Sequence, residues 1–195
     1  MRMTFSEFFK HPEADIVTIS SDDDSGSLPT FCYPGALPEA WVPGIAVRVM
    51  PSLGGSWIGY FQEGNMTPHG AQLCCAHPDG RRLVVVSRGA AYVVSMADPT
   101  DWEELSMLAV IGYCVAPAEQ VLVLYDHMQL LGLCADGLIW STPILSWDGI
   151  RSVEVINGTV IGEGWDASTS KYVPFSVDVR TGASSGGAAP PSDYE

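Results

Sequence analysis

Short apolar segments separated by turn residues recur along the chain at a constant spacing. An apolar segment at residues 83–86 is followed by a Ser-Arg-Gly turn and a second apolar segment at residues 91–94. The pattern returns at residues 122–125 and 161–165, which places Leu83, Leu122 and Ile161 at intervals of 39 residues. Three or four short strands in about 40 residues are typical of a β-propeller blade. We therefore expect these three side chains to occupy matching positions in successive sheet modules.

Turn signals mark the other strands of each module. The opening strands are predicted at residues 71–76, 109–115 and 151–156, and each runs into a turn that contains proline, aspartate, asparagine or glycine. Asn157-Gly158 is the strongest of these hairpin signals, because both residues tolerate positive φ. A more polar fourth strand is predicted at residues 104–107 and 138–142.

The same pattern sets the fold class. An irregular hairpin at residues 45–50 and 57–61 precedes the three regular modules. The chain is therefore predicted to be all-β, an antiparallel meander of repeated three- to four-stranded units that forms a small or incomplete β-propeller. A β-sandwich whose hairpins merely share a length is the alternative.

Composition shifts suggest three regions. Residues 1–44 are predicted to hold an N-terminal arm, a strand at 15–20 and an irregular proline-rich connection. Residues 45–182 form the repeated β-meander domain. Residues 183–195 are rich in glycine, alanine, serine and proline, which predicts a disordered tail.

The overall composition is that of a globular protein. Hydrophobic residues make up 47% and charged residues 16% of the chain, and no apolar run approaches the roughly 18 residues that a membrane helix needs. No secretory signal is recognised in residues 1–14, and the five cysteines are an odd number without CxxC spacing. We therefore expect a cytoplasmic protein without a membrane association.

The charge of the chain restricts its partners. Its 23 acidic and 9 basic residues give a formal net charge of −14. Such a field repels nucleic acid and attracts a basic protein, whose association it would accelerate. The alternative is that the acidity only keeps a half-apolar protein soluble.

The sequence contains no recognisable catalytic or metal-binding constellation. Cys114 and Cys134 lie in apolar segments where a thiolate is disfavoured. His69 and His77, with two cysteines between them, lack the paired spacing of a zinc site. We therefore expect no catalytic residue, no metal and no cofactor.

Binding residues are predicted where acidic and aromatic side chains occur together in loops. Trp102 is flanked by carboxylates after an Asp-Pro turn, and Trp147-Asp148 lies between two modules. Aromatic side chains bring a large contact area with few rotatable bonds to an interface. The candidate binding residues are Asp22, Asp23, Asp24, Asp101, Trp102, Glu103, Glu104, Trp147, Asp148, Trp165 and Asp166.

Several short sequence motifs in the C-terminal half resemble those of a known family. They are Leu-Ser-Trp-Asp-Gly-Ile at 145–150, Gly-Glu-Gly-Trp-Asp-Ala at 162–167, Val-Pro-Phe-Ser-Val-Asp at 173–178 and Thr-Gly at 181–182. In these motifs the chain resembles a family of uncharacterised bacterial β-propeller-like proteins. The likeness thins toward Ile45 and hardly reaches residues 1–40. The resemblance implies a cytoplasmic bacterial protein with a propeller-like fold, and it carries over no catalytic residue.

These observations favour a non-enzymatic bacterial protein-binding module, in its most concrete form an immunity-type inhibitor of a basic toxin. The alternative is a carbohydrate or small-ligand hydrolase or lyase that works in a propeller cleft, which requires side chains such as Glu163, Trp165 and Asp166 to converge. A third hypothesis is a structural subunit that forms a homo-oligomer through its sheet edges.

Overall fold

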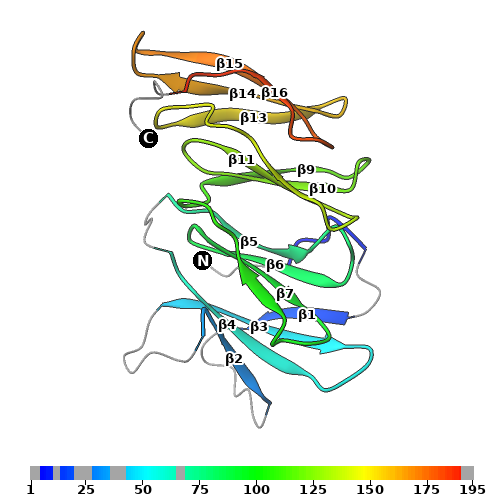
Figure 1. The fold of residues 1–195 in the computed structure, drawn as a ribbon. Helices are drawn as coiled ribbons and strands as arrows, with labels where there is room; N and C mark the ends of the chain where they lie inside the picture. The colour runs from blue at the N-terminus through cyan, green and yellow to red at the C-terminus, as the bar shows by residue number, and fades with distance from the viewer. Residues whose placement is uncertain (1–4, 11–13, 20–27, 36–42, 65–68, 190–195) are drawn as a thin grey trace. The chain divides into compact units, whose positions relative to one another are not determined.

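The computed structural model describes residues 5–10, 14–19, 28–35, 43–64 and 69–189 of the chain. All regular secondary structure in these residues is β-strand, and the strands form four sheets of four strands each (Figure 1). They divide into two compact units, Met1–Ala109 and Val110–Glu195, with two sheets in each. The predicted all-β fold of repeated sheet modules is confirmed. Helices that could span a membrane are absent from the described residues.

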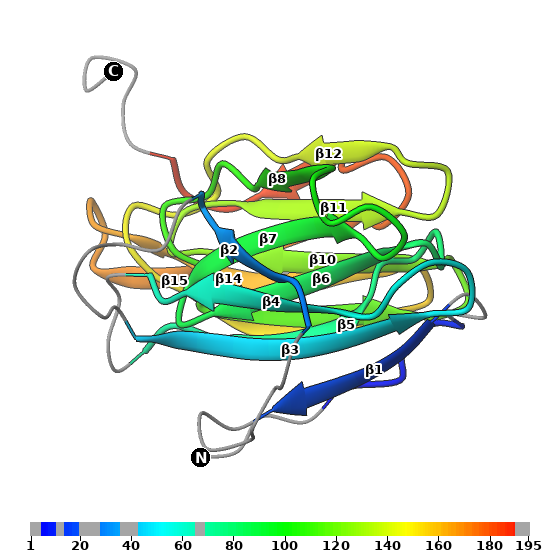
Figure 2. The ribbon, with the colours of Figure 1, turned by 90° about the horizontal axis from the view of Figure 1, so that it is seen from below.

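The first sheet departs from a simple meander. Its strands are β1 (Ala14–Ile19), β2 (Thr30–Tyr33), β3 (Gly44–Pro51) and β4 (Trp57–Gln62). They lie in the order β1-β3-β4-β2, and β2 pairs with β4 in parallel at one edge (Figure 2). The sequence predicts an antiparallel hairpin here, which β3 and β4 do form, but it does not predict that β2 joins the sheet.

The second sheet of the first unit is a regular antiparallel meander. Its strands are β5 (Gln72–Ala76), β6 (Arg82–Ser87), β7 (Ala90–Ser95) and β8 (Trp102–Glu104). Each strand pairs antiparallel with the next one in the chain. The central strands β6 and β7 are almost continuously apolar and buried, as expected of strands that are covered on both faces.

The second unit consists of two further antiparallel meanders. The third sheet contains β9 (Gly112–Ala116), β10 (Val121–Tyr125), β11 (Leu130–Cys134) and β12 (Ile139–Ser141). The fourth sheet contains β13 (Ile150–Ile156), β14 (Thr159–Asp166), β15 (Lys171–Asp178) and β16 (Ser184–Gly186). In Figure 1 the fourth sheet, in yellow to red, lies on one side of β9, β10 and β11.

An aromatic cluster joins the two sheets of the first unit. The ring of Tyr33 stacks on Phe61 with centroids 4.7 Å apart, and Phe61 lies 5.6 Å from Tyr92. The hydroxyl of Tyr33 donates to the carbonyl of Pro99 at 2.8 Å, and that of Tyr92 donates to the carbonyl of Gln62 at 3.1 Å. Burial, with a smaller contribution from the charge of Glu104, raises the pKa of Tyr92 to about 12. These hydroxyls therefore stay protonated and cross-link the sheets.

The second unit has a hydrophobic core between its two sheets. The third sheet contributes Val121 and Val123, and the fourth contributes Val160, Phe175 and Val177. All five are at most 3% exposed. Complete burial of side chains of this size contributes about 1.5–3 kcal/mol each, so this layer fixes the orientation of the fourth sheet relative to the third.

A buried tryptophan forms the same link in both units. The indole Nε1 of Trp57 donates to the carbonyl of Met96 at 3.0 Å, and Nε1 of Trp140 donates to the carbonyl of Val179 at 3.0 Å. In both cases donor and acceptor are 39 residues apart in the chain. The acceptor directly follows β7 in the first unit and β15 in the second unit. The 39-residue repeat therefore has a structural basis in the contact between neighbouring sheets.

The matched burial expected for the three repeat positions holds for two of them. Leu83 and Leu122 are fully buried, whereas Ile161 is 37% exposed. Val160 and Val177 are cross-strand partners in the core of the second unit, so the neighbouring pair of Ile161 and Ser176 points to the opposite side. A one-residue difference in register reverses the face of every side chain in a strand. The spacing of 39 residues from Leu122 to Ile161 therefore differs by one residue from the spacing between matching positions in the structure.

The segments outside the regular modules also form strands. Residues 14–19 form β1, close to the predicted strand at 15–20, and both β1 and β2 belong to the first sheet. Residues 184–186, which the sequence analysis assigns to a disordered tail, pair with β15 as β16. Three short residues, Ser-Ser-Gly, carry no strand signal, so tertiary pairing decides their conformation.

Candidate functional site

The fourth sheet presents an amphiphilic face on the side away from the third sheet. We call this side the outer face. Within it, Ile156 is 47% and Ile161 is 37% exposed. Cross-strand pairing places further side chains on the same side. The outer face comprises Arg151, Glu154, Ile156, Thr159, Ile161, Glu163, Trp165, Tyr172, Pro174, Ser176 and Asp178.

An arginine is bound on this face between an aromatic ring and a carboxylate. The guanidinium carbon of Arg151 lies 3.5 Å from the centroid of the Tyr172 ring, and its Nε donates to Glu163 at 2.9 Å. Trp165 packs edge-on against Tyr172 with centroids 5.1 Å apart. Stacking on an aromatic face together with a carboxylate contact is the environment that guanidinium groups prefer. The outer face thus shows how it can hold an arginine.

The Trp147-Asp148 loop is tied to the end of the same sheet. The Trp147 amide donates to the carbonyl of Trp165 at 3.0 Å, and the Trp165 amide donates to that of Gly149 at 2.9 Å. The Ser146 hydroxyl donates to the Gly149 carbonyl at 2.8 Å and accepts from the Trp165 amide at 3.0 Å. Asp148 is 83% exposed, 3.7 Å from Nδ1 of His127. The structure therefore brings Trp147, Asp148 and Trp165 together from separate segments.

Asp166 stabilises the turn that follows β14. Its Oδ1 accepts from the Ser168 hydroxyl at 2.6 Å and its Oδ2 from the Thr169 hydroxyl at 2.7 Å. These hydrogen bonds lower the pKa of Asp166. Part of its hydrogen-bonding capacity is thus used within the turn, and its main role in the structure is local.

The candidate residues of the first unit lie around β8. Asp101, Glu103 and Glu104 are exposed on this edge strand and the turn before it. Glu103 lies 3.6 Å from Arg82. Trp102, which the sequence analysis selects as a binding residue, is half-buried, and its ring packs edge-on against Tyr33 with centroids 5.3 Å apart. The β8 segment therefore offers carboxylates but holds its tryptophan against the interior. Asp22, Asp23 and Asp24 lie outside the described residues.

Sequence reasoning missed Arg151, Glu154, Ile156, Ile161 and Tyr172, which complete the outer face. Their signal is alternation. In β14, the buried positions Val160, Gly162 and Gly164 alternate with Ile161, Glu163 and Trp165. Such a pattern is typical of a sheet with one covered face. A count of acidic and aromatic loops does not detect it.

The carboxylates of the alternative enzymatic hypothesis do not converge. Glu163 and Asp166 lie three positions apart on β14, so their side chains leave the strand on opposite sides. Glu163 binds Arg151, and Asp166 binds its own turn. A glycosidase needs two carboxyl groups facing one cleft. The geometry therefore supports a binding surface better than a hydrolytic site.

The buried thiols and His77 also have structural environments. Cys74 and Cys75 are fully buried, and burial raises the pKa of Cys75 to about 12, which disfavours a nucleophilic thiolate. His77 is completely buried, with Nδ1 3.1 Å from Asp79 and Nε2 3.2 Å from the Arg82 guanidinium. Among the residues that the structure describes, no group of three or more His, Cys, Asp or Glu side chains could hold a metal ion.

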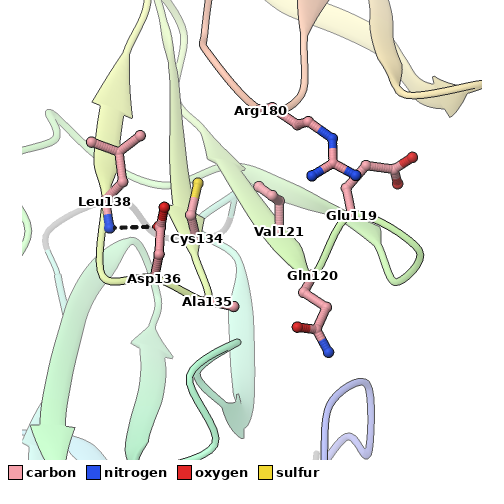
Figure 3. A pocket seen from close by; sticks show the side chains of 8 residues that line it. All are labelled: Glu119, Gln120, Val121, Cys134, Ala135, Asp136, Leu138 and Arg180. Atoms are coloured by element: carbon pink, nitrogen blue, oxygen red, sulfur yellow. Dashed lines mark hydrogen bonds between the residues drawn. The ribbon is translucent and has the colours of Figure 1, made fainter.

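A surface pocket of about 250 Å³ lies among the turns of the second unit. In Figure 3 the side chains of Arg180 and Glu119 lie next to each other on one side of this pocket. Across the pocket, Asp136 Oδ1 accepts from the Leu138 amide at 3.0 Å. Charges of both signs line the pocket, so it favours no single ligand charge. Its lining residues are Glu119, Gln120, Val121, Cys134, Ala135, Asp136, Leu138 and Arg180.

Comparison with known proteins gives structural neighbours only. No protein-family model matches the chain, and no curated protein matches it. One similar solved structure is described as the crystal structure of the N-terminal domain of Nup159, with 12% identity and a TM-score of 0.43 over 98% of this chain. Another is S. cerevisiae Dbp5 L327V bound to Nup159, Gle1 H337R, IP6 and ADP, with 12% identity and a TM-score of 0.42 over 99% of this chain. The chain spans 56% of the length of each matched chain.

Proposed function

We propose that this chain is a cytoplasmic, non-enzymatic bacterial protein-binding module that recognises a basic protein. Its most concrete form is an immunity-type inhibitor that captures a basic toxin, and membership of the β-propeller-like family is part of the proposal. The supporting observation is the excess of exposed carboxylates on both units of a chain with a net charge of −14. Those exposed in the described residues include Asp98, Asp101, Glu103, Glu104, Asp148, Glu154 and Asp178.

The scaffold suits this role. Tightly packed sheets hold the loops and faces in place, so that few side chains must be ordered on binding. Basic residues near the carboxylates are already engaged, since Arg82 pairs with Asp79 and Glu103, and Arg151 pairs with Glu163. The net charge of −14 makes the field outside the molecule negative, and this field attracts a basic partner more strongly at low ionic strength.

The test is capture from a lysate of the native host at low and at high salt, with the full chain on the matrix. An unrelated acidic protein of equal net charge on a second matrix controls for simple ion exchange. We expect a basic protein that is retained by this chain, is absent from the control and is released by salt. Retention of the same proteins by both matrices, or of no basic protein by this chain, would remove the proposal.

The toxin hypothesis has its own assay. The captured protein is expressed alone and then together with this chain, and growth is followed. Toxicity that co-expression relieves supports the immunity-type role. A captured protein that is harmless to the host supports protein binding but refutes the toxin version.

A further inference from the structure

We propose that the outer face of the fourth sheet is the docking surface for the partner, and that it takes a segment in which basic and apolar side chains are interleaved. This inference rests on the proposed function and deepens it, since it assigns the surface and the partner's chemistry. The carrying observation is that exposed isoleucines, carboxylates and an aromatic pair share one face of one sheet.

The apolar part of the face consists of two exposed isoleucines. Ile161 lies on the central strand β14, and Ile156 lies near the end of the adjacent strand β13. At 37% and 47% exposure, both keep apolar area that a partner can cover. Exposed apolar groups rimmed by polar ones mark interaction surfaces. The partner must therefore bring apolar side chains of its own.

Carboxylates surround these isoleucines. Glu154 is the cross-strand partner of Ile161. Glu163 lies two residues after Ile161 on β14 and on the same face. Asp178 lies at the end of β15, opposite Thr159. Three carboxylates thus stand against Arg151, the one basic side chain that pairing places on this face, and Arg151 is already bound to Glu163. The remaining charge calls for arginine or lysine from the partner.

Arg151 shows how a partner arginine would be held. Its guanidinium covers the Tyr172 ring and donates to a carboxylate at 2.9 Å, with Trp165 buttressing the ring. Trp165 and Tyr172 are half-buried and fixed by their contacts, so they offer rigid anchors for an interface. The face therefore combines guanidinium recognition with apolar contact.

Charge complementarity also separates a basic partner from a second copy of this chain. Two copies joined through the outer face would bring Glu154, Glu163 and Asp178 of each against those of the other. Like charges at an interface disfavour association. The β8 segment is the weaker candidate, because its tryptophan packs against Tyr33 and its exposed side chains are mainly carboxylates.

The probe is a synthetic strand peptide, Arg-Thr-Ile-Thr-Arg-Thr-Ile-Thr-Arg, whose arginines and isoleucines project on one side. A control peptide with serine in place of isoleucine has the same charge. Binding of both to the full chain is followed by amide chemical shifts in NMR. We expect shifts on β13, β14 and β15, and an affinity about tenfold higher for the isoleucine peptide, since apolar burial adds to attraction.

Matched variants locate the site. Ile161→Ser is compared with Ile139→Ser, because Ile139 is also 37% exposed but lies on β12. Glu154→Lys is compared with Asp15→Lys, which makes the same charge change at an exposed position of β1. We expect Ile161→Ser and Glu154→Lys to weaken the isoleucine peptide about five- to tenfold, and the two controls to change it less than about twofold. Amide spectra check that each variant is folded.

The outcomes separate this inference from the proposed function. Equal affinities for the two peptides, no shifts on the fourth sheet, or loss of binding through Asp15→Lys instead of Glu154→Lys would each overturn the docking surface. A basic protein captured from the lysate would then still support the proposed function. If the wild type sediments as a dimer that Ile161→Ser dissociates, the outer face mediates self-association, and this result would also overturn the docking surface for a basic partner. Failure to capture any basic protein refutes the proposed function itself.

Discussion

Gly132 is the position at which one added methyl group tests the packing of the second unit. It lies on β11 opposite Trp140 of β12, and the indole ring covers it. A Cβ atom at residue 132 would overlap the ring and lie 2.6 Å from its Nε1. Ordinary contact requires about 3.5–4.0 Å. Gly132→Ala therefore forces the indole to move by more than an ångström.

The cost follows from what the indole holds. Trp140 is 6% exposed and donates to the Val179 carbonyl at 3.0 Å, which links the third and fourth sheets. Overpacking costs about 1–3 kcal/mol, and loss of a hydrogen bond of this kind adds about 1 kcal/mol. We expect Gly132→Ala to lower the free energy of unfolding by about 2–4 kcal/mol. Gly55→Ala is the control, since nothing lies within 4 Å of a Cβ there, and it should change the free energy by less than about 0.5 kcal/mol.

A double-mutant cycle isolates the steric term. Trp140→Ala alone removes packing and the hydrogen bond, at a cost of about 3–5 kcal/mol, but it makes room for a methyl group at residue 132. The double variant should therefore be more stable than the sum of the single effects predicts, by at least about 1 kcal/mol. Urea unfolding followed by far-ultraviolet circular dichroism measures all four proteins. Additive effects, or a harmless Gly132→Ala, would refute the argument that the indole occupies this space.

Three shorter tests concern Asp79, Cys75 and Asn157. Burial opposes ionisation of Asp79, but hydrogen bonds from His77, the Arg81 amide and Arg82 outweigh the effect of burial and lower the pKa of Asp79. Ionised Asp79 therefore stabilises the folded state above the ordinary aspartate pKa of about 4, and this stabilisation is lost as the pH falls below that value. Asp79→Asn should cost about 1–3 kcal/mol at pH 7, and urea unfolding should show the difference shrinking as the pH falls below about 4. Cys75, whose pKa is raised to about 12 by burial, should resist a thiol reagent at pH 8 until the chain is unfolded, and rapid native labelling found by peptide mass spectrometry would contradict this. Asn157 has a φ of 49° in the hairpin turn, so Asn157→Ala should lower stability by about 1 kcal/mol in thermal unfolding, and an unchanged melting temperature would argue against that turn.

Much of the fold was predictable because the central hairpins carry strong local signals. The apolar runs at 83–86 and 122–125 fall within β6 and β10, and Asn157-Gly158 joins β13 to β14 as expected. These strands are covered on both faces or joined by turns with defined residue preferences. Their local sequence and their tertiary environment therefore favour the same structure.

The elements that were missed depend on partners far away in the chain. β2 joins the first sheet in parallel at the far side of β4, and β16 is a Ser-Ser-Gly strand that β15 recruits. The phase of Ile161 depends on loop lengths between modules, and one residue is enough to reverse its face. No local propensity encodes any of these features.

The candidate site was predictable only in part. Acidic and aromatic residues that occur together in the sequence identified Trp147, Asp148 and Trp165, and backbone hydrogen bonds bring these residues together. Arg151 and Tyr172 were not selected, because a cation–π contact between two strands has no sequence spacing of its own. Trp102 was selected as a binding residue, but its ring packs against Tyr33, which lies on a strand that the sequence did not place beside it.

The contrast between β10 and β14 explains why the outer face invites a partner. β10 reads Val-Leu-Val-Leu and is buried on both sides, as expected of a strand whose two faces are both covered. β14 has polar or aromatic side chains at the outward positions 159, 163 and 165, which is the composition of a solvent-facing sheet, yet position 161 and the neighbouring position 156 hold isoleucine. A face that only met water would gain nothing from these two side chains, whereas a face that binds an interleaved basic and apolar segment needs both them and the carboxylates around them. If Ile161→Ser leaves stability unchanged while it abolishes the preference for the isoleucine peptide, the side chain serves binding; if it only destabilises the sheet, Ile161 is part of the fold.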